Sequence, residues 1–381
     1  MSGGVFCTKD SFYRTLKLSF FMKQLFAFQQ RFNPLFKAQL LERIQRAKSL
    51  TSEPLLRMAL EHLAPLLLQG GKRLRPYLAH LMYRALSGKT GTKILPCLSA
   101  LEFFQAFALM HDDIMDRGAL RHGQPTMHRF VHEQLIKRKR LGDLAQAGTS
   151  QAILIGDLLH TWTHEHLIRP PQITRQAWRR AVSLFMTMAE EVIVGQMIDI
   201  DLTTQSNASL DSITKKMLLK TASYTVIRPL QIGAALGGAR PAVHQFCASF
   251  GRSLGLAFQI QDDLVDLIQP SKQLKKTTFS DLTDRAATYF TYHMLNHGTQ
   301  AQQRAFKKIF GTTLTEADRP RILTLLTNSG AIAFGRKMIR HHFSRAEQLL
   351  KRAPLPEHAK QELHDLMEYL HSLAPQKTDK E

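Results

Sequence analysis

Apolar residues recur at intervals of three and four through nearly all of the 381-residue chain. This spacing places them on one face of an α-helix, whereas the alternation typical of β-strands is scarce. Glycine and proline pairs such as Gly70-Gly71 and Pro170-Pro171 separate the periodic segments, and no proline- or serine-rich linker divides the chain. We therefore predict an all-α fold in one large domain. The expected helices span residues 35–53, 54–69, 76–86, 97–115, 151–167, 176–200, 210–236, 243–268, 281–295, 301–310, 319–327, 331–352 and 357–373.

The chain is strongly basic, because 51 lysines and arginines outnumber 31 aspartates and glutamates and give a formal net charge of +20. Basic clusters occur at residues 137–140, 175–180 and 336–342, in separate segments and without a zinc-finger, RNA-recognition or basic-zipper pattern. We therefore expect solvated helix faces and no nucleic-acid partner. A basic surface also attracts anionic substrates.

The two ends of the chain differ from its body. Residues 1–31 form a basic, phenylalanine-rich N-terminal extension and residues 376–381 a polar tail, which leaves residues 32–375 for the main domain. The extension fits an interfacial helix with peripheral membrane contact, a transit-like segment, or a helix packed on the body, and the last is the simplest reading. We expect no membrane-spanning helix, since no run of 18 apolar residues occurs. Three widely spaced cysteines without a CxxC pair favour a cytoplasmic location.

Two acid clusters follow apolar segments and share the spacing Asp-Asp-x-x-Asp. They are Asp112, Asp113 and Asp116 after "CLSALEFFQAFALM", and Asp262, Asp263 and Asp266 after "SFGRSLGLAFQI". In a helix, residues four apart lie about 40° apart around the axis, so the first and last acid of each cluster share a face. Like charges placed in this way destabilise a bare helix and resist burial. Each cluster therefore needs a positive partner.

The donor set points to a hard divalent cation. Carboxylates without an accompanying Cys or His constellation do not suit zinc, whereas magnesium binds one or two carboxylates together with water and substrate phosphates. Two such clusters on facing helices could clamp magnesium ions around a diphosphate. We therefore predict Mg²⁺ as the cofactor, with a solvated helix end as the alternative for either cluster alone.

Basic residues suited to a diphosphate occur elsewhere in the chain. The stretch "GGKRLRP" places Lys72 and Arg75 after a Gly-Gly turn, where backbone can approach an anion and the side chains supply charge and paired donors. The spacing of a Walker P-loop is absent. Further candidates for phosphate contact are Arg121, Lys220 and Gln259, although each alone could be a solvated cation or, for Gln259, a packing amide.

Together these motifs resemble the trans-isoprenyl diphosphate synthase family, the polyprenyl synthetases. In chain order they are GGKRLRP, DDIMD with a following RxG element, GQPT, GDLL, GQMID, KT and FQIQDDLVD. The resemblance covers residues 32–373 and is strongest to bacterial short-chain geranylgeranyl diphosphate synthases. It implies the isoprenoid synthase fold, a helical bundle around a deep central cavity. It also implies a homodimer that condenses isopentenyl diphosphate with allylic diphosphates through a carbocation.

The resemblance assigns roles residue by residue. About three Mg²⁺ ions would be bound by Asp112, Asp116 and Asp262. The catalytic set would be Asp112, Asp113, Asp116, Lys220, Asp262 and Asp263, with Asp266 supporting the second cluster. Isopentenyl diphosphate would contact Lys72, Arg75, Gln105 and His122. The allylic diphosphate would contact Arg121, Lys220, Thr221, Gln259 and Lys276.

Two positions depart from the family pattern. The family has two arginines before a glycine where this chain has Arg121 and His122, which makes one diphosphate contact weaker or pH-dependent. After the second acid cluster Lys276 and Asp281 fit the pattern, but Ala286 stands where the family has a lysine. These departures keep open the alternative of a poorly active regulatory subunit of a hetero-oligomeric synthase. A terpene cyclase is a further alternative, although such enzymes lack GGKRLRP and a second DDxxD motif.

Product length is expected to be set beneath the first acid cluster. At about 1.5 Å per residue, Phe107 lies roughly 7.5 Å and Phe104 roughly 12 Å below Asp112 along a helix. Position 108 is alanine, so a single aromatic stands directly under the acids. In this family that pattern resembles geranylgeranyl diphosphate synthases. We therefore predict a C20 product, with C15 farnesyl diphosphate as the close alternative and plain core packing as another reading of these phenylalanines.

Overall fold

The computed structural model describes residues 9–269 and 279–373, with side chains from Phe21 onward. The described residues are almost entirely helical, as the apolar spacing predicted, and the strands form one short hairpin. The helices are α1 (Lys9–Ser49), α2 (Pro54–Leu68), α3 (Leu74–Ser87), α4 (Leu95–Met115), α5 (Met127–Lys137), α6 (Leu144–Leu167), α7 (Arg175–Thr204), α8 (Leu210–Met217), α9 (Arg228–Leu236), α10 (Pro241–Ile268), α12 (Ser280–Thr283), α13 (Tyr289–His297), α14 (Gln300–Lys307), α15 (Arg319–Asn328), α16 (Ala331–Lys351) and α17 (Glu357–Ser372). A π-helix (Leu218–Ile227) joins α8 to α9, two 3-10 turns cover Thr92–Ile94 and Glu316–Asp318, and the hairpin pairs β1 (Leu120–Arg121) with β2 (Gln124–Pro125).

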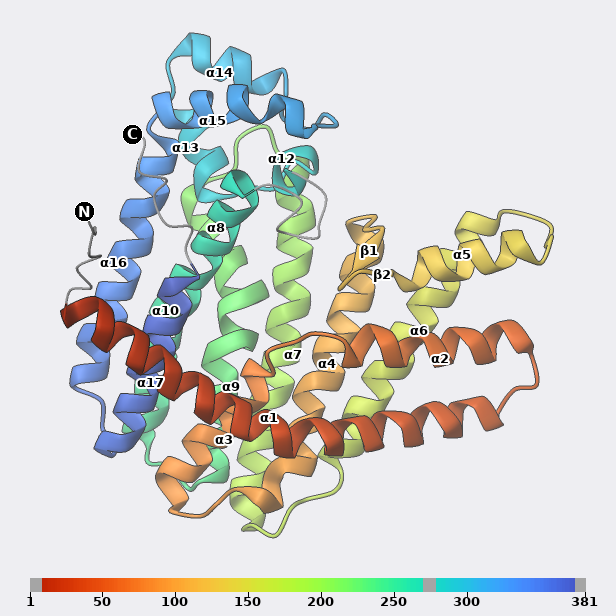
Figure 1. Ribbon diagram of the computed structural model, residues 1–381, viewed down its shortest axis with the longest axis vertical. Coiled ribbons are helices and arrows are strands. Elements are labelled where there is room, and N and C mark those ends of the chain that lie inside the picture. Colours follow the sequence, from red (N-terminus) through yellow and green to blue (C-terminus); the bar gives the residue numbers. More distant parts are fainter. Residues whose placement is uncertain (1–8, 270–278, 374–381) are drawn as a thin grey trace, which may run out of the picture.

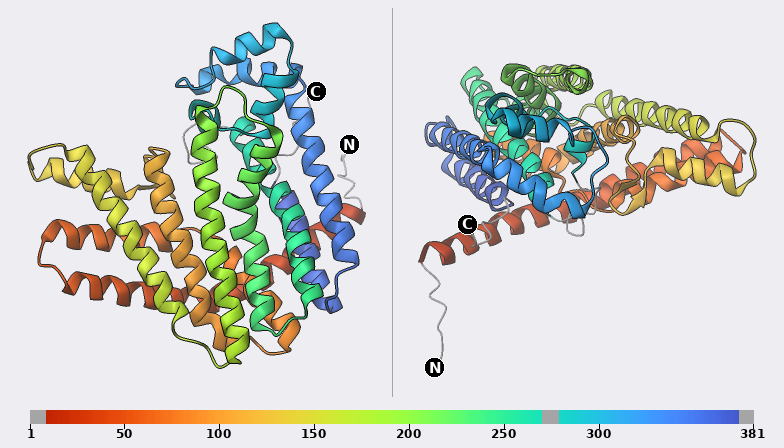
Figure 2. Two further views of the ribbon diagram at one scale, coloured as in Figure 1. Left: turned by 180° about the vertical axis from the view of Figure 1, so that it is seen from behind. Right: turned by 90° about the horizontal axis from the view of Figure 1, so that it is seen from above.

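The long helices α4, α7, α10 and the π-helix with α9 stand roughly upright as a central bundle, which α16 flanks and α14 and α15 cap (Figure 1). Helices α1 and α2 run crosswise to this bundle, and with α5 and α6 they extend to one side of it (Figure 2). Helices α4 and α10 both end toward the same end of the bundle (Figure 1). Because each acid cluster is the last part of its helix, both clusters are delivered to that end.

Residues 21–31 belong to a helix that continues into the main domain. Helix α1 runs from Lys9 to Ser49, so the boundary expected after residue 31 falls inside a continuous helix. Phe21, Leu25 and Phe28 are buried, and Phe28 stacks on Phe32 with ring centroids 5.2 Å apart. Of the three interpretations of this segment, packing on the body describes residues 21–31, because their buried apolar side chains recur at intervals of four and three and Phe21 and Phe28 pack on Tyr77. Residues 1–8 lie outside the described part of the chain.

The expected helix over residues 210–236 is divided in the structure. A ten-residue π-helix, Leu218–Ile227, replaces the α-helical hydrogen-bond pattern between α8 and α9. Pro229 follows at the start of α9, and because the π-helix runs directly into α9 this proline lies inside a continuous helical segment, where it has no N–H to donate. Such π-helical turns are rare and occur often at functional sites. The expected helix over residues 281–295 is divided too, into α12 and α13, because Thr288 caps a new helix with a reciprocal bond to Thr291.

Two helices are long and apolar enough to cross a membrane by length and composition alone, Thr92–Met115 and Arg175–Thr204. In the first, 67% of the apolar window is buried inside the fold, which is the property of a core helix. In the second, 33% is buried, and Ile193, Val194 and Met197 are exposed on α7.

Candidate active site

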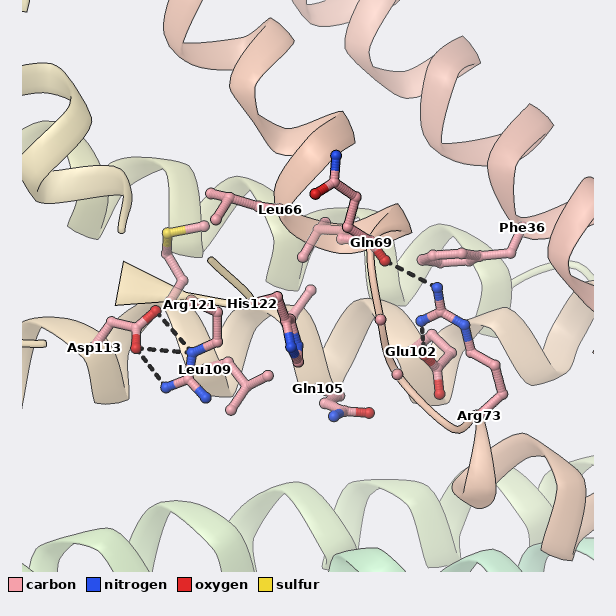
Figure 3. Close-up of a pocket in the computed structure, with 15 residues that line it drawn as sticks. Phe36, Leu66, Gln69, Arg73, Glu102, Gln105, Leu109, Asp113, Arg121 and His122 are labelled. Atoms are coloured by element: carbon pink, nitrogen blue, oxygen red, sulfur yellow. Dashed lines mark hydrogen bonds and ion pairs between the residues drawn. The ribbon is translucent and has the colours of Figure 1, made fainter. Parts of the chain in front are cut away.

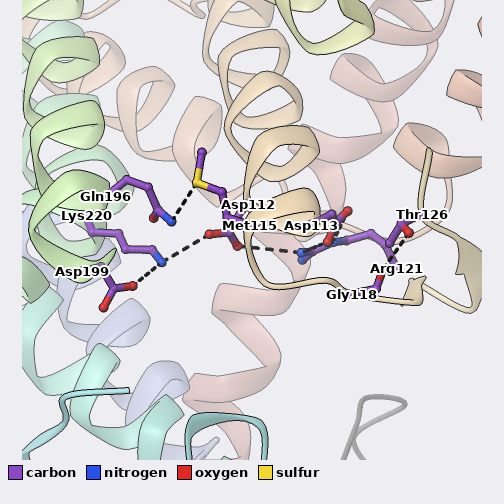
Figure 4. A network of polar contacts seen from close by, with 9 residues as sticks. All are labelled: Asp112, Asp113, Met115, Gly118, Arg121, Thr126, Gln196, Asp199 and Lys220. Carbon is purple, nitrogen blue, oxygen red and sulfur yellow. Dashed lines mark hydrogen bonds and ion pairs between the residues drawn. The ribbon is translucent and has the colours of Figure 1, made fainter. Parts of the chain in front are cut away.

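The first acid cluster is held by one cation on each side. Lys220 Nζ lies 3.2 Å from Asp112 Oδ1, and Arg121 forms a two-pronged ion pair with Asp113, with Nε 2.9 Å from Oδ1 (Figure 4). Arg121 also approaches Asp112, with Nη2 4.0 Å from Oδ2. The β1–β2 hairpin makes this possible, since the pairing of Arg121 with Gln124 turns the chain back onto the end of α4. The predicted phosphate ligands Arg121 and Lys220 therefore flank the predicted metal ligand Asp112.

The acids of this cluster exceed the positive charge available to them. Burial, and then the neighbouring charge of Asp112, raise the pKa of Asp116 to about 7, although Lys220 opposes the shift. Burial also raises the pKa of Asp113 despite its ion pair with Arg121. Burial thus favours the neutral form of these two carboxyls, whereas a cation bound next to them would favour the charged form.

A fourth carboxylate, from outside the cluster, joins it to a second lysine. Asp199 of α7 lies between two ammonium groups: Lys220 Nζ is 2.6 Å from its Oδ2, and Lys216 Nζ is 3.1 Å from its Oδ1. Burial alone would raise the pKa of Asp199, but the two lysines hold it below its ordinary value. Lys220 in turn lies between Asp199 and Asp112, and these acids raise its pKa although its burial acts in the opposite direction. The motif GQMID marked Asp199 without a role, whereas no motif marked Lys216.

Close helix packing fixes the backbone that carries Lys220. Gly195 of α7 and Gly255 of α10 touch the π-helix from opposite sides. A Cβ on Gly195 would come within 2.4 Å of the Lys220 backbone nitrogen, and one on Gly255 within 2.4 Å of the Ala222 side chain. Only glycine permits this approach. Thr221 is half-buried next to Lys220 on the same π-helix.

The second acid cluster is more deeply placed, apart from its first member. Asp262 is exposed, while Asp263 and Asp266 are buried. Gln259 Nε2 donates a hydrogen bond to Asp263 Oδ1 at 2.6 Å, so the Gln259 side chain contacts the acid cluster. Asp266 accepts from the Ser280 hydroxyl at 3.1 Å.

The Asp281 carboxyl adds a further acid to this second group. Its pKa is raised well above the ordinary value, first by burial and then by Asp266 and Asp263. Burial raises the pKa of Asp263 to about 7 as well. Asp281 matched the family pattern in sequence, and the structure brings it against Asp266, with its backbone nitrogen 3.4 Å from Oδ2. Lys276 lies outside the described residues.

The basic stretch after Gly70-Gly71 turns its side chains in different directions. Arg75 Nη2 donates to Thr225 Oγ1 at 2.9 Å, and its guanidinium lies over the Tyr224 ring, 3.9 Å from the centroid. Lys72 Nζ lies 5.2 Å from the centroid of Tyr369. Arg75 thus contacts the same π-helix that carries Lys220.

A pocket of about 530 Å³, partly open to solvent, lies between α2, α4 and the hairpin (Figure 3). It is lined by Gly70, Gly71, Gln105, Arg121 and His122, among others. His122 lies against the glycine turn, because a Cβ on Gly70 would meet its Nδ1 at 3.1 Å. The structure therefore brings two of the predicted isopentenyl diphosphate contacts, Gln105 and His122, into one pocket. Lys72 and Arg75 are not among the residues that line it.

Arg73, to which the sequence assigned no role, anchors the loop after Gly70-Gly71 to the neighbouring helices. It forms a buried ion pair with Glu102 of α4 and donates to the Leu67 carbonyl at 2.9 Å. Its own backbone is left-handed, with φ 54°. The buried pair ties the glycine turn to α4 and so fixes one wall of the pocket.

Aromatic side chains close the bundle beneath the acids. Phe104 is fully buried and meets Phe185 of α7 edge-on, with ring centroids 5.6 Å apart. Phe107 stacks on His160 of α6 at 4.7 Å, and Ala108 packs half-buried beside it. A second, apolar pocket of about 290 Å³ is lined by Leu98, Leu101 and Phe185 among others. Phe185 and His160 come from distant helices and carried no sequence signal.

The carboxylate oxygens of the two acid clusters suit a hard divalent cation whose remaining ligands would come from substrate and water. Among the described residues, no group of three or more His, Cys, Asp or Glu side chains is arranged to hold a metal ion. Magnesium does not need such a cage, since it is commonly bound by one or two carboxylates plus substrate phosphates and water. The Asp263 Oδ2 atom is buried without a hydrogen-bond partner, and Asp116 has its pKa raised to about 7. Both observations fit an added positive charge between the clusters.

Comparison with known proteins agrees with this geometry. The chain is similar to the geranylgeranyl diphosphate synthase of Methanosarcina mazei, at 30% identity over 70% of this chain and 74% of the relative. It is also similar to the geranylfarnesyl diphosphate synthase of Aeropyrum pernix, at 28% identity over 78% and 88%. Among solved structures, the geranylgeranyl pyrophosphate synthase from Corynebacterium glutamicum, complexed with isoprenyl diphosphate and magnesium, aligns with a TM-score of 0.81, 26% identity and coverage of 89% and 98%. The model of the polyprenyl synthetase family matches residues 54–325, and the chain belongs to that family.

Proposed function

We propose that this protein is a trans-prenyltransferase that condenses isopentenyl diphosphate with an allylic diphosphate, and that its main product is C20 geranylgeranyl diphosphate. The observation that carries the proposal is the row of contacts from Asp199 through Lys220 and Asp112 to Arg121 (Figure 4). Carboxylates that can bind a metal ion thus alternate with basic side chains that can bind phosphate, at the end of an apolar bundle. A diphosphate leaving group needs both.

The reaction breaks the bond between C1 of the allylic substrate and its diphosphate oxygen, and the electron pair leaves with the diphosphate. The isopentenyl double bond then attacks C1, and the proton released from C2 passes to the departing diphosphate. Bound Mg²⁺, held by Asp112, Asp116 and Asp262, would supply Lewis-acid stabilisation of the leaving group. Lys220 and Arg121 would neutralise diphosphate oxygens directly, because both lie at the first acid cluster.

The remaining predicted residues divide between the two substrates. Thr221, Gln259 and Lys276 would complete the allylic diphosphate site. Lys72, Arg75, Gln105 and His122 would bind isopentenyl diphosphate. Gln105 and His122 already share the pocket beside the glycine turn, and it adjoins Arg121. Water is kept from the cation by the apolar residues that pack below the acids, as carbocation chemistry requires.

The C20 product rests on the aromatic floor. Phe107, five residues before Asp112 on α4, stacks on His160, and Phe104, about one helical turn earlier, meets Phe185. Relatives carry names for C15, C20 and C25 synthases, so the floor of this chain must be tested on its own. C15 farnesyl diphosphate is the alternative product.

A direct assay tests the activity. Purified protein is incubated with labelled isopentenyl diphosphate and with dimethylallyl, geranyl or farnesyl diphosphate, with and without Mg²⁺. We expect Mg²⁺-dependent incorporation and a C20 product on reversed-phase chromatography. Absence of incorporation with every primer would reject the enzyme and favour the regulatory subunit, whose signature would be activity that appears only after addition of a partner synthase.

We also propose a cytoplasmic homodimer. Large apolar side chains are exposed on α6 and α7, namely Ile153, Leu154, Ile193, Val194, Met197 and Ile200. A second copy of this chain would cover them. Light scattering after size exclusion should give twice the chain mass, and Met197→Glu should shift the protein to the monomer. A wild-type monomer at micromolar concentration would refute the dimer.

The cytoplasmic location is a separate proposal. The buried cysteines Cys97 and Cys247 are free, which fits a reducing compartment. Cell fractionation tests the location, since recovery of the protein in the membrane pellet would contradict it.

A further inference from the structure

Lys216 is a buried cation for which the activity proposed above has no role. Its side chain is about nine-tenths buried, and its Nζ lies 3.1 Å from Asp199 Oδ1. Four residues later, Lys220 contacts the other oxygen of the same carboxylate at 2.6 Å. One carboxylate is therefore shared by two ammonium groups. Burying a lysine is costly unless it is compensated, so the second ammonium calls for an explanation.

Lys216 also acts electrostatically on the second acid cluster. Its charge is the largest influence that lowers the pKa of Asp263, and it acts in the same direction on Asp281. The groups that act on these acids come from α8, which supplies Lys216, and from α10, which supplies Gln259 and further aspartates. Among the causes resolved for Asp281, Lys216 is the only cation.

We propose that Lys216 is a positioning residue that couples the two acid clusters, by sharing Asp199 with Lys220 and by supplying a fixed positive charge beside Asp263. The inference rests on the proposed prenyltransferase activity. It follows from the order of contacts, in which Asp112, Lys220, Asp199 and Lys216 alternate in sign from the first cluster toward the second.

Sharing Asp199 keeps Lys220 available to substrate. With Lys216 in place, half of the Asp199 charge is already neutralised, and Lys220 can turn an N–H toward a diphosphate oxygen. Without Lys216, Asp199 has Lys220 as its remaining ammonium partner and holds it more strongly. Loss of Lys216 should therefore weaken allylic diphosphate binding. The isopentenyl site, built by residues near Gly70, should be little affected.

The same loss should have the opposite effect on metal binding. Removing a positive charge next to Asp263 and Asp281 increases the net negative charge of the second cluster. In the absence of substrate, that cluster should then bind a divalent cation more tightly. A residue with a purely structural role would weaken both kinds of binding or neither.

The experiment compares Lys216→Met, Lys216→Arg and the control Lys215→Met. Lys215 is exposed on the same helix, so its replacement removes the same charge without touching Asp199. Mn²⁺ binding without substrate is followed by electron paramagnetic resonance, and KM is measured for each substrate. For Lys216→Met we expect at least threefold tighter Mn²⁺ binding, an allylic KM raised about tenfold and an isopentenyl KM within twofold. Lys216→Arg should restore most of the allylic KM, and Lys215→Met should resemble the wild type.

Two results would overturn the role of Lys216: unchanged Mn²⁺ affinity in Lys216→Met, or equal increases in both KM values. Circular dichroism shows whether Lys216→Met folds, and if it does not, Lys216→Gln and Lys216→Arg carry the comparison, since Gln removes the charge and Arg keeps it. A wild-type protein that neither binds Mn²⁺ nor elongates any primer would instead overturn the proposed function, so the two failures are distinguishable.

Discussion

Phe104 of α4 meets Phe185 of α7 edge-on, with ring centroids 5.6 Å apart, between the acid end of the bundle and an apolar pocket that Phe185 also lines. Through Phe185, the pair connects the helix that ends in the first acid cluster to the lining of that pocket. A growing prenyl chain that reached this point would stop against two rings. Above it, Phe107 and His160 form an earlier barrier at 4.7 Å.

Replacing Phe107 by Ala should lengthen the products beyond C20, and replacing Phe104 as well should lengthen them further by opening the second pocket. The product distribution is read by reversed-phase chromatography after hydrolysis of the diphosphate. Phe103→Ala is the matched control, because Phe103 packs on Phe36 and Trp162 instead. This control should cost about 3–5 kcal/mol of stability while leaving product length unchanged. If Phe107→Ala gave the wild-type product, the floor assignment would fail.

Asp199→Asn should destabilise the protein and impair allylic diphosphate use together. The change removes the carboxylate partner of the buried Lys216 and leaves the half-buried Lys220 with Asp112 alone, and breaking a buried pair costs about 3–5 kcal/mol. Thermal unfolding and the allylic KM measure the two effects. Asp201→Asn, on the exposed face of the same helix, is the control and should change neither. An Asp199→Asn protein with wild-type melting temperature would contradict the network described above.

His122→Arg should tighten isopentenyl diphosphate binding. The pocket that His122 lines also holds Gln105 and the Gly70-Gly71 turn, so an arginine there would add charge-assisted donors next to the expected diphosphate. We expect KM for isopentenyl diphosphate to fall about tenfold, the equivalent of one such bond at about 1.5 kcal/mol. The allylic KM is the internal control and should stay constant. No change in the isopentenyl KM would remove His122 from that site.

Buried histidines should make the fold sensitive to acid. Burial, followed by the charges of Arg43 and Arg169, lowers the pKa of His166 to about 4, against 6.5 in the unfolded chain. Between these values the unfolded state binds a proton that the folded state does not, so stability is full above pH 6.5 and falls as the pH decreases. His166→Phe keeps the stacking on Phe103 and removes this proton.

The free energy of unfolding of His166→Phe minus that of the wild type should therefore increase as the pH is lowered. The increase should be about 1.4 kcal/mol per pH unit between pH 6.5 and 4.5. Urea titrations at a series of pH values measure it, and the difference should be constant above pH 7. Comparing the two proteins cancels the contribution of Asp116 and Asp263, whose raised pKa values act in the opposite direction. A difference that does not depend on pH would show that His166 is protonated in the folded state.

The helical class, the family and the core of the first acid cluster were predictable from sequence. Apolar spacing is a local property, so it predicted nearly every helix, and motif order placed Asp112, Arg121 and Lys220 in one site, where the structure brings them together. The sequence failed where local pattern gives no signal. The π-helix and the separation of α12 from α13 depend on backbone hydrogen bonding that periodicity does not distinguish from a continuous helix.

Only the tertiary structure decided which side chains share a charge or close a cavity. Asp199 and Lys216 became partners because Gly195 lets α7 approach the π-helix, and Phe185 and His160 contact the phenylalanines of α4 that we propose as the floor. Residue types and their order along the chain determine the chemistry a site can perform. The distances and burial that set each group's charge arise from contacts between helices far apart in sequence, and these exist only once the bundle has packed.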